Sequence, residues 1–563
     1  MSSKQGLNAM KKIIAGSAAA VLSLSVMTVG VSASQQAYDN YGYDRYGDPV
    51  PSQAGFVARE FTDGRILGCG AFDEPSDLFV SDELLYVLDK GNGRIVILDT
   101  DMRYVREIDE FDFDSYRAAH PEVEFESKAE AEAEEAEREQ EEEAPAEEAP
   151  AEESAEEGDD AEETEVEAAP PKKQSYLLKE PTGICVTPDG TIYIADTKNS
   201  RIVICDGDGK VINLLLIPDS EVYNAETFIP RKVSVDKAGN VYVAASNPRG
   251  AVVYNPEGEF TGFFGANRVE VTPAVRARKL WALISSDEQL KYTVKSTASP
   301  ISNMDIADDG FIFTVSETTN SSTDIVKKLN AKGQNIIQDT QAYWGDYPST
   351  YYSIYAKPSM LTDIEIDENG SINILDYQHC RIFQYDKEGW LLFITGGTGE
   401  QLGTFRNPSA IESFENKIYV TDSTKNNITM FVRTDFGEIV TEATNLLNDG
   451  YYEEAVEPWQ EVIKRDGNYN RAYIGIGNAY LNSGRYEEAM EYYKISLSVW
   501  RYDRAYEGYR SEIMRNNFTA IVIVLAAILA AVIILRIVSA KGLVMPRSPA
   551  EVISDIASRL RKE

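Results

Sequence analysis

Four charged residues stand at the same position of a segment that recurs along the chain. Asp77, Asp305 and Asp363 begin predicted innermost strands, and Lys232 has the same place in another copy. Carboxylate oxygens are the ligands that Ca²⁺ prefers, so this set could hold Ca²⁺ or a cationic ligand at the mouth of a central channel. An aspartate at such a position can instead cap a turn, and both interpretations stay open here.

Residues for hydrolytic or lyase chemistry are scarce. The chain has 2 histidines, His120 and His379. A three-histidine zinc site is therefore excluded, and a Ser/His/Asp triad would have one plausible base. A hydrolase with a central metal would need Glu, Asn and Asp around one ion, and we match no such set to the sequence. We therefore predict no catalytic residues.

The charged residues are positioned by a pattern that occurs six times. In its clearest copy, residues 181–209, an apolar strand and a Pro-Asp-Gly turn precede a strand that ends at Asp196 and another that begins at Arg201. The other copies begin near Pro75, Pro230, Ile301, Leu361 and Pro408. Four short apolar strands between turn residues are typical of a β-propeller blade, in which both faces of the sheet are buried.

This pattern resembles the NHL repeat, which has a proline, an apolar strand, an Asp-Gly turn, a Tyr-Val-x-Asp strand and an Asn-x-Arg-Ile strand. The resemblance covers residues 55–433 and implies a six-bladed β-propeller. Some propellers with this repeat are amidating lyases, but the two histidines do not match them. Asp196 and Arg201 should pair within their blade. Because only three strands precede Arg433 in the last copy, we expect residues 56–61 to supply its fourth strand and close the ring.

Long insertions follow the predicted fourth strands, at residues 107–180, 264–300, 336–357 and 396–407. By chain direction they should all decorate one rim, which we expect to carry the binding surface and to face away from the membrane. Residues 122–172 are rich in Glu, Ala and Pro and should be disordered. Residues 272–284 should form an amphipathic helix. The net charge of -38 argues against a nucleic-acid partner.

The C-terminal part combines a repeated motif with a long apolar segment. The motif Asn-Asp-Gly-Tyr-Tyr-Glu-Glu-Ala at residues 448–455 returns in similar form at residues 482–489. This spacing resembles that of tetratricopeptide repeats and implies paired helices over residues 434–516. Residues 517–538 predict one transmembrane helix, and residues 539–563 a short cytoplasmic tail.

The N-terminus has the parts of an export signal. Basic residues precede an apolar run, and small residues lead up to Ala33. We predict a signal peptide over residues 1–33, with an uncleaved signal anchor as the alternative. Residues 34–54 should form a Tyr-rich linker. The propeller and the helical repeats would then lie outside the membrane, with the C-terminus in the cytoplasm.

The predicted fold class is mainly β: a six-bladed NHL-type β-propeller, an α-helical tetratricopeptide-like array and a single transmembrane helix. The predicted function is an extracytoplasmic, membrane-anchored scaffold that binds a protein or glycan through the propeller rim and the helical repeats. A membrane complex would be a further partner. The alternative is a metal-dependent hydrolase, similar to lactonases, acting on a sugar-derived substrate in the channel. Apart from Ca²⁺ at the channel mouth, we expect no cofactor.

Overall fold

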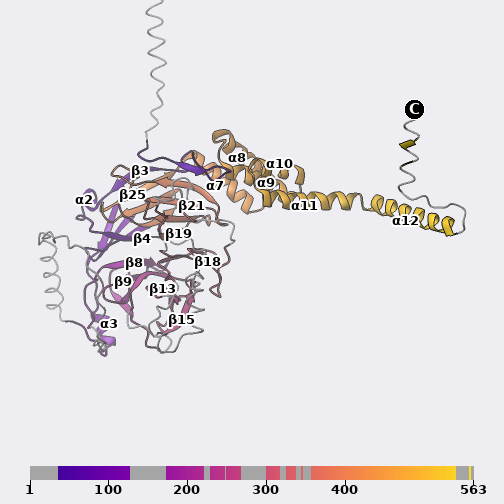
Figure 1. The fold of residues 1–563 in the computed structure, drawn as a ribbon. Coiled ribbons are helices and arrows are strands. Elements are labelled where there is room, and N and C mark those ends of the chain that lie inside the picture. The colour runs from indigo at the N-terminus through magenta and orange to yellow at the C-terminus, as the bar shows by residue number, and fades with distance from the viewer. Residues whose placement is uncertain are drawn as a thin grey trace, which may run out of the picture. The chain divides into compact units, whose positions relative to one another are not determined.

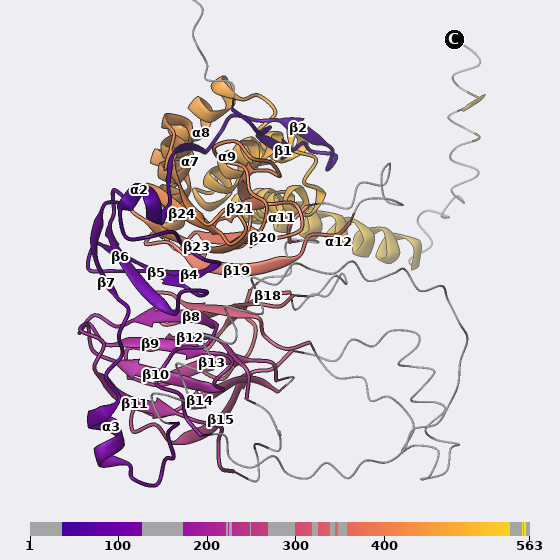
Figure 2. The same cartoon turned by 90° about the vertical axis from the view of Figure 1, so that its left-hand side faces the viewer.

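The chain forms two compact units in a computed structural model (Figures 1 and 2). The structure describes residues 36–126, 173–220, 223, 228–247, 249–267, 299–317, 325–337, 344–346 and 357–540, with 554, 557 and 558. One unit holds Met1–Thr441 and Lys464–Arg471, and the other holds Glu442–Ile463 and Ala472–Glu563.

The first unit contains seven antiparallel sheets among its described residues, and six of them are the blades. Blade 1 consists of β4 (Pro75–Ser81), β5 (Leu84–Asp89), β6 (Arg94–Asp99) and β7 (Tyr104–Ile108). Blade 2 consists of β8 (Pro181–Val186), β9 (Ile192–Asp196), β10 (Arg201–Cys205) and β11 (Val211–Leu215). Blade 3 consists of β12 (Pro230–Val235), β13 (Val241–Ala245), β14 (Gly250–Tyr254) and β15 (Phe260–Gly265). Blade 4 consists of β16 (Asn303–Ile306), β17 (Ile312–Val315) and β18 (Val326–Leu329). Blade 5 consists of β19 (Leu361–Ile366), β20 (Ile372–Asp376), β21 (Arg381–Tyr385) and β22 (Leu391–Gly396). Blade 6 consists of β23 (Pro408–Phe414), β24 (Lys417–Asp422), β25 (Asn427–Arg433) and β3 (Phe56–Thr62).

The first strands of the blades make a closed ring. β4, β8, β12, β16, β19 and β23 contact one another in that order, and β23 returns to β4. Figure 2 shows the sheets of blades 1, 2 and 3 following one another around the unit. The predicted six-bladed propeller is therefore confirmed.

Both ends of the propeller sequence meet in blade 6. β3 pairs antiparallel with β25, from Phe56 opposite Arg433 to Thr62 opposite Ile428. The prediction that residues 56–61 supply the missing strand is confirmed. This pairing covers the edge of β25, which would otherwise present unpaired backbone groups.

The strands are apolar on both sides because each sheet packs between two others. Leu88 and Ile95 of blade 1 lie in one core cluster with Ile184 and Val203 of blade 2, and all four are fully buried. This burial explains why the sequence shows continuous apolar runs where a sheet with one wet face would alternate. Blade 4 is the exception in length, with three strands among its described residues and a bridge between Leu329 and Asn335.

The segment expected as a linker contains a hairpin. β1 (Tyr41–Tyr43) pairs with β2 (Pro49–Pro51), and β1 contacts β22 of blade 5. Tyrosine side chains anchor this hairpin, as described below. Two short helices also occur, α2 (Gly64–Leu67) and α3 (Asp114–Ala119).

Helices follow the propeller. They are α7 (Asp435–Asn448), α8 (Tyr452–Arg465), α9 (Asn470–Asn482), α10 (Tyr486–Ile495), α11 (Val499–Asn516) and α12 (Phe518–Ala540). The repeated Gly450 and Gly484 have φ of 88° and 77°, a left-handed conformation that ends α7 and α9 at glycine. Gly475 packs against Trp459, where an added Cβ would lie 2.6 Å from the indole. The sequence motif thus marks helix ends.

One helix in the described part of the chain could cross a membrane. Phe518–Val538 spans 21 residues with a mean hydropathy of 3.2, and 0% of it is buried. Figure 1 shows α12 extending beyond α11 at the yellow end of the chain.

Several predicted features lie outside the described residues. They are the signal peptide at 1–33, the acidic segment from residue 127 to 172, the helix at 272–284 and most of the tail at 539–563. These remain predictions.

Candidate functional site in the central channel

The four charged residues singled out in the sequence lie on first strands, around the centre of the ring. Asp77 is on β4, Lys232 on β12, Asp305 on β16 and Asp363 on β19. The structure joins two of them directly: Lys232 Nζ lies 2.7 Å and 2.8 Å from the two carboxylate oxygens of Asp77. Both side chains are buried, so Lys232 of blade 3 reaches past blade 2 to neutralise a carboxylate of blade 1.

The three aspartates each link their own blade to the next one. Each carboxylate accepts a backbone N–H from the first strand of the following blade: Asp77 from Ile184 (2.7 Å), Asp305 from Ile366 (2.8 Å) and Asp363 from Ile411 (2.7 Å). Each of these bonds satisfies a backbone donor and a carboxyl oxygen that burial removes wholly or partly from water. These aspartates therefore hold neighbouring blades together.

Two further carboxylates that the sequence reasoning missed belong to the same cluster. Glu412 on β23 accepts the Val80 N–H of blade 1 at 3.1 Å. Glu365 on β19 accepts from the Ser413 hydroxyl (2.6 Å) and the Asn373 amide (2.7 Å). Glu365 lies two residues after Asp363, and alternate residues of a strand share a face. The spacing of two residues between Asp363 and Glu365 could therefore have predicted that Glu365 belongs to the cluster.

Burial sets the protonation of this cluster. It raises the pKa of Asp363 to about 7, although the Lys232 charge opposes the rise. Burial, followed by repulsion from Asp367 and Asp305, raises the pKa of Glu365 well above its usual range. Burial is the largest single influence on the pKa of Lys232 and lowers it, but the charges of Asp77, Asp363 and Glu412 and the hydrogen bond to Asp77 together outweigh burial, so the net pKa is raised. Several carboxyls facing one ammonium group will hold protons near neutral pH.

The cluster has the ligand chemistry for Ca²⁺, but its oxygens already have hydrogen-bond partners. Both oxygens of Asp305 and of Asp363 accept backbone N–H groups, and both oxygens of Asp77 contact Lys232. This geometry favours a structural role for the aspartates. Binding of Ca²⁺ at the channel mouth stays a prediction.

A second polar cluster lies in blade 5. His379 Nδ1 is 2.7 Å from Asp376 and 3.8 Å from Asp346. The hydrogen bond with Asp376 raises the pKa of His379, and burial only partly opposes it. Arg381 pairs with Asp346 and donates to the Tyr41 hydroxyl at 2.9 Å, which fixes the β1 hairpin to the blade. Asp346, Asp376 and His379 are close enough to hold a metal ion, but Arg381 already neutralises Asp346.

Blades 1 and 2 show which residue stands at the position of His379 in other copies of the repeat. Arg94 pairs with Asp89 at 2.8 Å and Arg201 with Asp196 at 2.7 Å, as expected for pairs within a blade. In both blades an asparagine donates to the same carboxylate at 2.8 Å: Asn92 to Asp89 and Asn199 to Asp196. His379 takes the place of that asparagine, so its first role is structural.

Comparison with known proteins gives one family match and several distant structural similarities. Residues 178–205 match the model of the NHL repeat. No curated protein matches the chain. Among solved structures, virginiamycin B lyase from Staphylococcus aureus is similar at 10% identity, over 71% of this chain and 97% of that chain, with a TM-score of 0.34. A streptogramin B lyase is similar at 11% identity, over 68% and 100%, with a TM-score of 0.36.

A protein of unknown function from Bacteroides thetaiotaomicron is similar at 10% identity, over 70% of this chain and 76% of that chain, with a TM-score of 0.36. Likeness at these values says nothing about activity. The ring of six sheets and the matched segment together show that the first unit is a six-bladed β-propeller that contains an NHL repeat.

Proposed function

We propose that this chain is an extracytoplasmic, membrane-anchored binding protein that holds a protein or glycan partner on its propeller rim and helical repeats. The observation that carries the proposal is the exposure of α12. Ile523, Leu525 and Leu529 are 63%, 60% and 62% exposed on a helix with no buried face. Such a surface is unfavourable in water and favourable in hydrocarbon, so the helix would anchor the chain in a bilayer.

The architecture of the propeller supports binding at its rim. The connections from β7 to β8, from β15 to β16, from β18 to β19 and from β22 to β23 are long, and each leads from the last described strand of one blade to the innermost strand of the next. A connection that leaves a fourth strand begins and ends on the same side of the ring, as those after β7, β15 and β22 do. Loops on a rigid scaffold are the usual place for binding residues.

The channel gives less support to catalysis. Its aspartates are bonded to backbone N–H groups and to Lys232, which favours a structural role over hydrolysis. The remaining parts of the proposal follow from sequence: a signal peptide at 1–33, tetratricopeptide-like pairing at 434–516 and a cytoplasmic tail. In this account the helical repeats and the transmembrane helix would engage a membrane complex.

Thiol labelling of intact cells tests the topology. In a Cys69→Ser background, the remaining cysteines are buried. Asp208→Cys, in an exposed turn of blade 2, should react with a membrane-impermeant maleimide on intact cells. The matched variant Ser558→Cys in the tail should react only after permeabilisation. The opposite pattern would overturn the proposed topology.

A further inference from the structure

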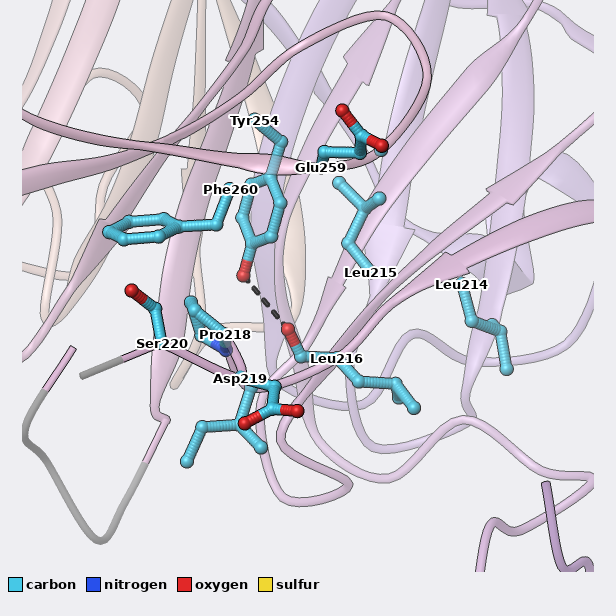
Figure 3. Close-up of a pocket in the computed structure, with 11 residues that line it drawn as sticks. Leu214, Leu215, Leu216, Pro218, Asp219, Ser220, Tyr254, Glu259 and Phe260 are labelled. Atoms are coloured by element: carbon cyan, nitrogen blue, oxygen red, sulfur yellow. Dashed lines mark hydrogen bonds between the residues drawn. The ribbon is translucent and has the colours of Figure 1, made fainter. Parts of the chain in front are cut away.

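A cavity of about 590 Å³ lies between blades 2 and 3, away from the central channel (Figure 3). One side is the end of β11 and the connection after it, residues 214–220. The other side is formed by Tyr254 at the end of β14 and by residues 258–260, the last of which begins β15. The volume falls within the range of small-molecule sites, about 300 to 1,000 Å³.

Two aromatic side chains, those of Tyr254 and Phe260, form a wall of this cavity, and because Tyr254 is only 2% exposed the accessible ring is that of Phe260. Phe260 packs against Tyr223, Tyr254 and Phe263, with ring centroids 6.0 Å, 6.3 Å and 5.5 Å away. The Tyr254 hydroxyl donates to the Leu216 carbonyl at 2.9 Å, a bond that ties the two blades together (Figure 3). Phe260 itself is half-buried. The wall is therefore held in place before any ligand arrives.

Two carboxylates flank the aromatic wall. Asp219 and Glu259 are exposed and come from opposite sides of the cavity (Figure 3). Glu259 accepts a bond from Asn255 at 3.1 Å, which leaves further acceptor capacity on that carboxylate. Figure 3 shows the Glu259 carboxylate above the Tyr254 ring and the Asp219 carboxylate below it, so each end of a ligand that extends along the cavity would meet one hydrogen-bond acceptor.

We propose that this cavity binds a neutral or amino-sugar unit of a glycan. A pyranose has an apolar C–H face that packs on an aromatic ring and a rim of hydroxyls that donate to carboxylates. The two negative charges disfavour uronic acids and phosphorylated sugars. This inference rests on the proposed binding function and names its ligand class. Residues 214–220 also begin the connection from blade 2 to blade 3, and connections between blades are where we expect binding residues.

Binding of defined oligosaccharides to the full chain in detergent micelles tests the inference. The probes are cellotetraose, mannotetraose, chitotetraose and tetraglucosamine, with tetragalacturonate as the anionic comparison and tetralysine as the basic-peptide comparison. We expect at least one neutral or amino sugar to bind, and tetragalacturonate not to bind. Asp219→Asn and Glu259→Gln should each weaken that binding about tenfold, because each removes a charge-assisted hydrogen bond.

Two variants keep the test interpretable. Asp208→Asn, in an exposed turn of blade 2 outside the cavity, should leave sugar binding unchanged. Phe260→Leu keeps an apolar side chain but removes the ring, and should also weaken binding while the thermal midpoint stays within a few degrees.

Three results would overturn the inference: none of the sugars binds, sugar binding is unchanged by all cavity variants, or only tetralysine binds and does so through the carboxylates. In the second case the glycan site lies elsewhere and the proposed function survives. A cytoplasmic propeller in the labelling experiment would instead remove the proposed function itself.

Discussion

At the scale of single residues, the propeller uses one repeat position for two purposes. Aspartates at the start of first strands reach the backbone of the next blade, whereas Lys232 at the same position neutralises one of them. Repeat alignment predicted which positions carry charge. It could not predict the partners, because Lys232 and Asp77 lie 155 residues apart. Asp346 beside His379 was equally hidden, since it comes from an insertion.

Removing the ammonium group of Lys232 should destabilise the propeller. Lys232→Met leaves the Asp77 carboxylate buried without its cation, which typically costs about 3 to 5 kcal/mol. The expected result is a clear drop in the urea midpoint of the full chain. Lys237→Met, at an exposed lysine of the same blade, is the control and should change little. Adding Asp77→Asn should restore part of the loss, and no recovery would contradict the pairing.

Asp363 should make stability fall as pH rises. Its folded pKa is about 7, raised from 3.8. Between these two values the folded state keeps a proton that the unfolded state has lost, so stability decreases as pH rises through that window. Asp363→Asn should flatten this slope in urea midpoints measured from pH 4 to 8. An unchanged slope would show that Asp363 is ionised in the folded protein.

His379 should add a second pH dependence with the same sign. Its folded pKa lies above the ordinary value of 6.5, so its stabilisation is fully present below that pH and is lost as pH rises through the folded pKa. His379→Asn restores the residue found in blades 1 and 2. The variant should show a smaller pH dependence of the thermal midpoint above pH 6, with the contribution of Asp363 remaining, and should keep the fold. If the dependence is as large as in the parent chain, His379 does not contribute to it.

At the scale of elements, closure of the ring depends on a strand far from its partner in sequence. β3 was predictable because the last repeat has only three strands where a blade needs four. The β1 hairpin was not predictable in the same way. Tyr41 meets Asp346 and Arg381, residues that no local pattern connects to it. Blade 4 was harder to outline for a related reason, since its repeat is the most degenerate.

Two deletions separate the closing strand from the hairpin. Removing residues 34–62 deletes β3 and exposes the edge of β25, so we expect aggregation in size-exclusion chromatography and rapid proteolysis of blade 6. Removing residues 34–54 takes away the hairpin and the contacts of Tyr38 with Ala58 and Phe431 but keeps β3. That shorter deletion should lower the thermal midpoint but leave a monodisperse, protease-resistant ring. Equal behaviour of the two would contradict closure by β3.

At the scale of the whole molecule, one chain contains a closed propeller and an apolar helix long enough to span a membrane. The propeller followed from the repeats because six copies of one pattern have few other ways to bury both faces of their strands. The cavity between blades 2 and 3 did not follow, since Tyr254 and Leu216 come together only through packing of whole sheets. The spanning segment could be seen from composition alone, but exposure on every side required the structure.

Membrane attachment through α12 is the claim on which the proposed function depends most. Alkaline carbonate extraction of membranes should leave the full chain in the pellet, whereas a chain ending at Asn516 should be recovered in the soluble extracytoplasmic fraction with its propeller folded. Extraction of the full chain by carbonate, or retention of the truncated chain in the membrane, would contradict the account.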